Sequence, residues 1–242
     1  MEKYTLILVS KLRYLLLMLL LLPLQACAFY YSAAPIEARV VDAATNQPLE
    51  GVIVVAHWQL KGGLEGGNPV GEMMVMETLT DAKGRFYFPG WGPKLRSLEG
   101  RLKTQSPGIL LFKSGYEYRG LENNLNNKSL RGDLDNPLRS DWNGKTIKLE
   151  RFKGGLEKYE ELFEDFNHAL ERMATDQPDK CNWKNIPMTI RAMNQERKRL
   201  IALGVTTNTL STIDNELLMN DPFYTKKGGC GSPKEFFKGF QE

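Results

Sequence analysis

The stretch Val52-Ile53-Val54-Val55-Ala56-His57-Trp58-Gln59-Leu60 decides the fold, because it predicts a β-strand with apolar side chains on both faces. One face carries Val52, Val54, Ala56, Trp58 and Leu60, and the other carries Ile53, Val55, His57 and Gln59. A half-exposed strand is apolar on one face only, whereas this strand needs a covering layer on each side. The sequence therefore predicts a central strand, with His57 on its mixed face.

The same period of two extends from Ile36 to about Phe152, and clusters of Gly, Pro and Asn interrupt it. Turn residues are concentrated at 46–51 and 81–84. No helical run separates the strands, so parallel crossover units are excluded and an antiparallel sandwich is predicted. Besides 52–60, the expected strands are residues 36–40, 73–80, 85–88, 108–113 and 145–151.

A set of turn and core residues in this half carries a family resemblance: Asp42, Thr45, Pro48, Leu49, Gly51 and Val54, then Thr80-Asp81, Gly84 and Phe86, and later Gly115-Tyr116. Their order and spacing resemble the carboxypeptidase regulatory-like family, which implies a transthyretin-like β-sandwich over residues 36–153. In the turn, Asp81 can accept hydrogen bonds from the backbone and Gly84 can take a positive φ. The domain is the noncatalytic companion of those peptidases, so the resemblance implies binding and not peptidase activity.

Two segments depart from the family pattern, namely the glycine-rich residues 61–71 and the long polar insertion 121–143. A rigid sandwich displays such segments at its ends, so they are candidate binding loops. The alternative is that they are merely flexible connections.

Beyond Gly155 the apolar period changes to 3.6, which predicts helices. One amphipathic helix is expected over 156–173, a second from Pro187 to a stop at Gly204, and a third, shorter one over 210–218. The tail 226–240 interleaves lysines with phenylalanines, which we interpret as aromatic packing against the domain, with an anionic surface or partner groove as the alternative. The predicted fold class is α+β, with the antiparallel sandwich followed by a helical region of about three helices over 154–242.

Residues 1–26 predict an export signal, with a positive start and an apolar run over 14–24. A transmembrane anchor is the alternative, but the run is shorter than the roughly 20 residues needed to span a bilayer. The stretch Leu24-Gln25-Ala26-Cys27 resembles the processing site of bacterial lipoproteins. This resemblance implies acylation of Cys27, a tether over 27–35 and, because Ala28 follows, an address at the outer membrane facing the periplasm. Simple cleavage without lipid is the alternative.

The sequence contains three cysteines. Assignment of Cys27 to lipid leaves Cys181 and Cys230 as an even pair in an oxidising compartment, and we predict that they form a disulfide. Two free buried thiols are the alternative.

Charge and motif content narrow the function. The net charge of +3 falls to +1 once residues 1–26 are removed, so no nucleic-acid partner is expected. The two histidines, His57 and His168, do not form a catalytic zinc set, and neither a Gly-x-Ser-x-Gly elbow nor a phosphate-binding loop is present. Tyr118-Arg119-Gly120 resembles part of the terminal motif of hydroxyisourate hydrolases, but Leu121 replaces the serine and the partner histidines are lacking.

We therefore expect a noncatalytic, membrane-anchored envelope lipoprotein with a binding or scaffolding sandwich, and no catalytic residues, cofactor or metal. Its expected partners are the membrane, through the lipid, and an envelope protein or glycan. The alternative is a hydrolase or carbohydrate-active accessory factor with a carboxylate site between the two halves.

Overall fold

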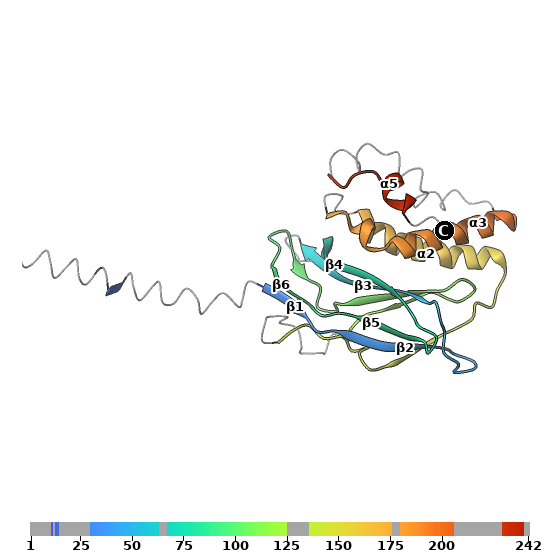
Figure 1. Cartoon of the computed structure of the whole chain (residues 1–242), viewed down its shortest axis with the longest axis horizontal. Coiled ribbons are helices and arrows are strands. Elements are labelled where there is room, and N and C mark those ends of the chain that lie inside the picture. The colour runs from blue at the N-terminus through green and yellow to red at the C-terminus, as the bar shows by residue number, and fades with distance from the viewer. Residues whose placement is uncertain are drawn as a thin grey trace, which may run out of the picture.

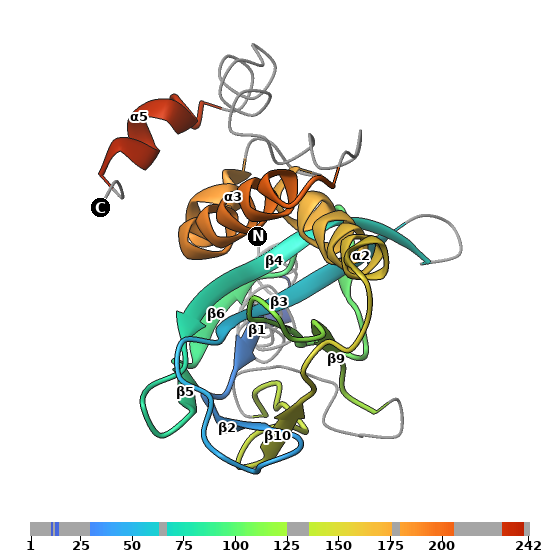
Figure 2. The same cartoon turned by 90° about the vertical axis from the view of Figure 1, so that its right-hand side faces the viewer.

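The computed structural model describes residues 30–62, 67–124, 136–175, 180–205 and 229–239, together with positions 11, 13 and 14. These residues form an antiparallel β-sandwich followed by a small helical region, so the predicted fold class is confirmed. Helices α2 (Leu156–Thr175) and α3 (Pro187–Ala202) cover the outer face of one sheet (Figures 1 and 2). The molecule thus has three layers, and the larger sheet lies in the middle.

The larger sheet has the strand order β4 (Asn68–Leu79), β3 (Ile53–Gly62), β8 (Gly108–Phe112) and β9 (Arg119–Leu121), while β7 (Arg101–Leu102) pairs with the end of β3. Every pairing in it is antiparallel, and Ile53 is opposite both Leu79 and Phe112. Residues 61–71 do not form only a loop, because their described parts extend β3 and β4.

The second sheet has the order β10 (Thr146–Leu149), β2 (Ile36–Asp42) and β5 (Arg85–Phe88). The pairing of β10 with β2 is parallel, which the antiparallel expectation did not include. Parallel neighbours need a long connection, and here the whole larger sheet separates the two strands in sequence.

In the turn before β5, Gly84 has φ +73°, and a Cβ there would lie 2.3 Å from the Val40 carbonyl oxygen. The predicted role of Gly84 is therefore confirmed.

A third, two-stranded sheet pairs β1 (Tyr30–Ala33) with β6 (Trp91–Leu95). The tether expected over 27–35 is therefore wrong for residues 30–33, which belong to the folded domain. Tyr31 and Ala33 are buried in the sandwich core beside Trp91, and this burial holds the strand in place. The six predicted strands are all present, whereas β1, β6, β7 and β9 were missed because they are short and lack a clear alternation.

Each face of β3 packs into its own hydrophobic core, as the sequence of this strand predicted. Val54, Ala56 and Trp58 face the second sheet, and the rings of Trp58 and Trp91 meet edge to face at 5.4 Å. Val55 faces the helices, where the ring of Phe112 stacks on that of Phe166 at 5.1 Å. One strand thus contributes to both cores, which is why it is apolar on both sides.

The helical region begins as the sequence predicted. Helix α2 spans the expected amphipathic run, and α3 begins at Pro187 and is followed by Gly204 at φ +86°. The third predicted helix, over 210–218, lies outside the described residues. A 3-10 turn, η3 (Asn182–Asn185), and the short helix α5 (Pro233–Lys238) were not predicted. Phe237 of α5 is buried, which agrees with the interpretation that the tail packs against the domain.

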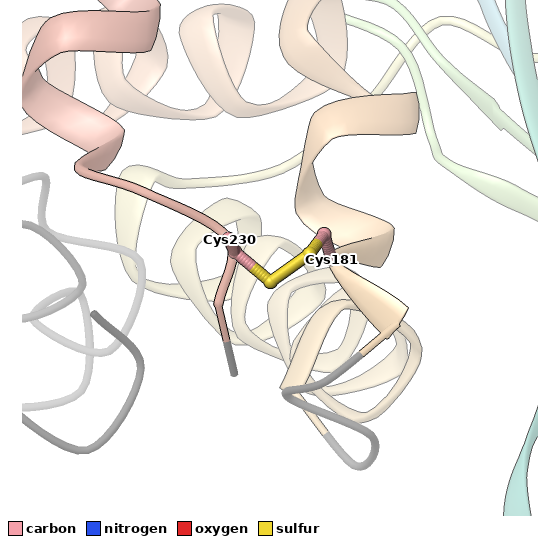
Figure 3. Close-up of a disulfide and its surroundings, with 2 residues drawn as sticks. All are labelled: Cys181 and Cys230. Atoms are coloured by element: carbon pink, nitrogen blue, oxygen red, sulfur yellow. A yellow bond between two sulfur atoms is a disulfide. The ribbon is translucent and has the colours of Figure 1, made fainter. Parts of the chain in front are cut away.

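The predicted disulfide is confirmed. Cys181 and Cys230 are bonded across 49 residues of sequence, with their Cα atoms 5.5 Å apart (Figure 3). The bond ties the segment before α5 to the start of η3, where the rings of Trp183 and Phe236 lie 5.2 Å apart. Cys27 and the predicted signal peptide, apart from positions 11, 13 and 14, lie outside the described part of the chain. Within that part, no helix combines the length and hydropathy that a bilayer crossing requires.

Candidate functional site between the sandwich and the helices

A cavity of about 410 Å³ lies where the end of the larger sheet meets α3. We call it the junction cavity. From the sandwich it is lined by Gly51, Ile53, Leu79, Phe112, Lys113 and Ser114, and from α3 by Met188, Arg191, Ala192, Gln195 and Glu196. Because Ile53 pairs with both Leu79 and Phe112, the start of β3 and the ends of β4 and β8 meet at one place. The antiparallel register therefore assembles one wall of the cavity and α3 supplies the other.

Glu196 is the only carboxylate among the described residues that line this cavity. Its side chain is 4% exposed, and it accepts hydrogen bonds from Ser114 Oγ at 2.7 Å and from Arg199 Nη2 at 2.6 Å. Burial alone raises the pKa of Glu196, but the hydrogen bonds from Arg199, Ser114 and Tyr159 outweigh it and lower the pKa below 4.5. Glu196 is therefore an ionised acceptor and is poorly suited to act as a general acid.

Tyr159 of α2 completes this group of side chains. Its hydroxyl accepts a hydrogen bond from the backbone N–H of Gly115 at 3.1 Å, and the guanidinium of Arg199 lies 5.5 Å from its ring centre. Burial raises the pKa of Tyr159 to about 12, with a contribution from the carboxylate of Glu196. We call Ser114, Gly115, Tyr159, Glu196 and Arg199 the junction cluster. It joins the end of β8 to both α2 and α3.

A second carboxylate, Glu77 of β4, holds the start of α3. Its Oε1 accepts the N–H of Met188 at 2.6 Å, and its Oε2 accepts the N–H and hydroxyl of Thr189 at 2.9 and 2.7 Å. Burial raises the pKa of Glu77 above 4.5, although these hydrogen bonds oppose the rise. Glu77 and Glu196 come from the two halves of the chain, which is what the alternative hypothesis of a hydrolase with a carboxylate site between the halves requires. However, Glu77 does not line the junction cavity, and both carboxylates serve in structural hydrogen bonds.

The cavity is suited to noncovalent binding. The Ser114 hydroxyl donates a hydrogen bond to Glu196, and the described residues that line the cavity include no imidazole or thiol that could act as base or nucleophile. Lys113 and Arg191 place positive charge at the cavity, and the Lys113 Nζ also donates to the Glu50 carbonyl at 2.8 Å. Apolar side chains complete the lining, among them Leu79, which is 45% exposed. These groups complement a ligand that carries both an apolar side chain and a negative charge.

The residues singled out in sequence lie elsewhere. His57 Nδ1 is 3.1 Å from Glu72 Oε1, and its ring covers Gly108, where a Cβ would lie 2.3 Å from Nε2. Neither His57 nor His168 belongs to a cluster of metal-binding side chains among the described residues. In the insertion 121–143, the buried amide of Asn123 donates to the carbonyls of Ser106 and Arg139. The described residues of both candidate loops are therefore absent from the junction cavity.

Asp42 and Tyr116, two residues of the family pattern, meet in a separate structural network. Asp42 is 2% exposed, and its Oδ2 accepts hydrogen bonds from Tyr116 Oη at 3.0 Å and from Arg151 Nε at 2.8 Å. The bond from Arg151, aided by the backbone N–H of Thr45, holds the pKa of Asp42 far below 3.8. This network ties β2 to the turn after β8 and to the segment after β10.

Sequence reasoning missed the junction cluster. Its one local signal is the pair Glu196 and Arg199, spaced for contact along a helix. Ser114 and Glu196 are 82 residues apart, so nothing in the sequence links them.

No family model matches this chain, and no curated protein does. Among solved structures, a streptococcal ancillary pilin has 13% identity and a TM-score of 0.27, over 51% of this chain and 31% of that one. The shaft pilin SpaA from Lactobacillus rhamnosus GG has 12% identity and a TM-score of 0.25, over 51% and 52%. A 9R-lipoxygenase from Cyanothece PCC8801 has 12% identity and a TM-score of 0.30, over 80% and 31%. The matches span about a third to a half of those proteins, and TM-scores this low identify neither a shared fold nor a shared function.

Proposed function

We propose that this chain is a noncatalytic lipoprotein of the bacterial cell envelope, anchored at the outer membrane through acylated Cys27 and facing the periplasm. Its junction cavity binds a segment of another envelope protein that carries apolar and acidic side chains. The membership of residues 36–153 in the carboxypeptidase regulatory-like family is part of the same proposal. The sequence Leu24-Gln25-Ala26-Cys27, with Ala28 after it, supports the anchor and the address.

The binding role rests on one observation: Glu196, the carboxylate among the described residues that line the junction cavity, is hydrogen-bonded within the protein and is therefore not available for acid or base chemistry. Glu196 is held by Ser114 and Arg199, so it is an acceptor that is already in use. Two cationic residues, Lys113 and Arg191, line the same cavity beside the apolar side chains of Ile53 and Phe112. An acidic, partly apolar protein segment matches this lining better than a neutral glycan does, because glycans need many hydrogen-bonding groups in the wall.

The test is site-specific photo-cross-linking of the full chain in intact cells. A photoreactive side chain replaces Gln195 in the cavity, and a matched one replaces Tyr87, which is 55% exposed on β5 of the other sheet. We expect one discrete protein adduct from position 195 and none from position 87. Ala192→Trp, which fills the cavity, should remove that adduct. Identical adducts from both positions, or none from position 195, would contradict the binding role.

The anchor is tested in the same cells with Cys27→Ser. We expect the variant to lose the mass of the acyl chains and to leave the membrane fraction, because two or more chains are needed for stable anchoring. Unchanged mass and fractionation would show that Cys27 does not carry the lipid.

A further inference from the structure

The distance along the chain between Cys27 and the folded domain is very short. Strand β1 begins at Tyr30, only three residues after Cys27. Three residues reach at most about 11 Å even when fully extended. A lipid on Cys27, on which this inference rests as part of the proposed function, would therefore bring the β1 end of the sandwich to the bilayer surface.

The end of the sandwich beside β1 is formed by β6 and the segment that follows it. Tyr30 pairs with Leu95, and Arg101 pairs with Lys61 near the end of β3. Close backbone packing holds the segment there, because a Cβ on Gly62 would lie 2.6 Å from the Glu99 carbonyl oxygen. Figure 1 shows β1 and β6 together at one end of the folded domain.

Two leucines project from this end into solvent. Leu95 is 66% exposed and Leu98 is 105% exposed. Among the described residues from Tyr30 onward, no other large apolar side chain is as exposed as these two. Isolated exposed leucines are common, but here Leu95 ends β6 and Leu98 follows it three residues later. They lie at the end of β6, which pairs with β1, the strand that begins three residues after Cys27.

Cationic residues flank these leucines in the sequence. Lys94, Arg96 and Arg101 form no ion pair with any carboxylate that the structure describes, and Glu99 is the single acidic residue among positions 91–101. The Arg96 guanidinium lies 4.7 Å from the ring centre of Tyr31, and Lys94 Nζ lies 3.3 Å from the Met74 sulfur. Lys94 and Arg96 are half-buried and Arg101 is exposed, and the three charges have no neutralising carboxylate among the described residues. Lysine and arginine at such a position attract anionic lipid headgroups.

We propose that Leu95 and Leu98, together with Lys94, Arg96 and Arg101, form a membrane-contact surface that seats the sandwich end-on on the bilayer holding Cys27. The occupant of this surface is the anionic phospholipid of that bilayer. The leucines enter the headgroup region, and the three cations lie among the phosphates.

This seating also orients the junction cavity. Ile53, which lines the cavity, and Gly62, beside the contact surface, are the two ends of β3. A ten-residue strand spans about 30 Å, so the cavity faces away from the bilayer and into the aqueous space. A partner protein would reach it without competing with the membrane.

The test uses the full acylated chain with Leu98→Cys, labelled with an environment-sensitive fluorophore and reconstituted into phosphatidylcholine vesicles with or without phosphatidylglycerol. With Cys27 acylated and the Cys181 to Cys230 disulfide intact, the new cysteine is the one thiol available for labelling. The matched control is Leu203→Cys, which is 50% exposed and follows α3. Glu196 of α3 contacts Ser114 at the Ile53 end of the sheet, so Leu203 lies at the end opposite to Leu98.

We expect the label at position 98 to shift its emission to the blue and to be quenched by lipid-borne nitroxide, while the label at position 203 stays aqueous. Phosphatidylglycerol should enlarge the shift, and Arg101→Glu should reduce that enlargement. Flotation of the chain with vesicles while both labels remain aqueous would overturn the contact surface and leave the anchor intact. Failure to float would overturn the anchor, and with it the seating. A blue shift that needs no vesicles and grows with protein concentration would assign the surface to a second copy of the chain, and would overturn the proposal.

Discussion

Glu77 is the most informative residue to change, because one carboxylate on a strand caps the start of a helix in the next layer. Helix α3 has no side-chain cap of its own at Ile186. Glu77 instead accepts the N–H groups of Met188 and Thr189 and the hydroxyl of Thr189. Thr189 is fully buried, so water cannot replace Glu77 as its partner. Glu77→Ala removes all three hydrogen bonds at once.

The size of the effect follows from these contacts. Loss of a helix cap costs about 0.5 to 2 kcal/mol, and a buried donor left without a partner costs about 1 to 3 kcal/mol. We therefore expect Glu77→Ala to lower the free energy of unfolding by about 2 to 4 kcal/mol. Glu77→Gln keeps one acceptor oxygen, but its amide NH2 would face the N–H donor that the other oxygen of Glu77 accepts, so its stability should lie between that of the wild type and that of Glu77→Ala.

The two variants should also differ from the wild type in how the free energy of unfolding depends on pH. Burial raises the pKa of Glu77 in the folded state above the ordinary 4.5 of the unfolded chain. The folded state then binds the proton more tightly, so the free energy of unfolding falls as pH rises from 4.5 through the raised pKa. Glu77→Gln carries no proton there, and its stability should lack this decrease.

The assay is urea unfolding at a series of pH values, followed by tryptophan fluorescence and circular dichroism for the wild type and both variants. Trp183 is buried in the helical layer, so its fluorescence reports on the region that Glu77 holds. Equal stability of Glu77→Ala and wild type would refute the capping role. Equal losses in Glu77→Ala and Glu77→Gln would contradict a graded contribution of the two acceptor oxygens.

The other predictions concern the disulfide and the network around Asp42. Replacement of both Cys181 and Cys230 by serine opens a link across 49 residues, and we expect a loss of about 4 kcal/mol in the free energy of unfolding, measured by urea unfolding against wild type without reductant. A loss below about 1 kcal/mol would mean that the unfolded chain gains little freedom. Asp42→Asn should destabilise the protein at neutral pH, because it removes the charge paired with Arg151. Since the pKa of Asp42 is lowered in the folded state, its contribution is complete above 3.8 and is lost as pH falls toward the folded pKa. The stability difference between wild type and Asp42→Asn should therefore shrink below pH 3.8, and a constant difference in acid unfolding curves would contradict the network.

The central part of the fold was predictable because it is encoded by near neighbours in sequence. The double-faced pattern of 52–60 identified β3 as a strand between two layers, and both layers are present. Pro187 and Gly204 marked the start and end of the second helix, because a proline suits the first turn and a glycine takes the positive φ after the last. The pairing of Cys181 with Cys230 followed once Cys27 was set aside. Periodicity, turn residues and cysteine number are local or countable properties, so the sequence determined them by itself.

Only the tertiary structure decided which distant residues meet. The parallel pairing of β10 with β2, the short ribbon of β1 and β6, and the contact of Ser114 with Glu196 all join segments far apart in the chain. The physical reason is that strand register and layer packing set these contacts, and many combinations of the same local elements would satisfy the same periodicity. The junction cavity exists because three strand ends and one helix converge, and none of those four segments specifies it alone.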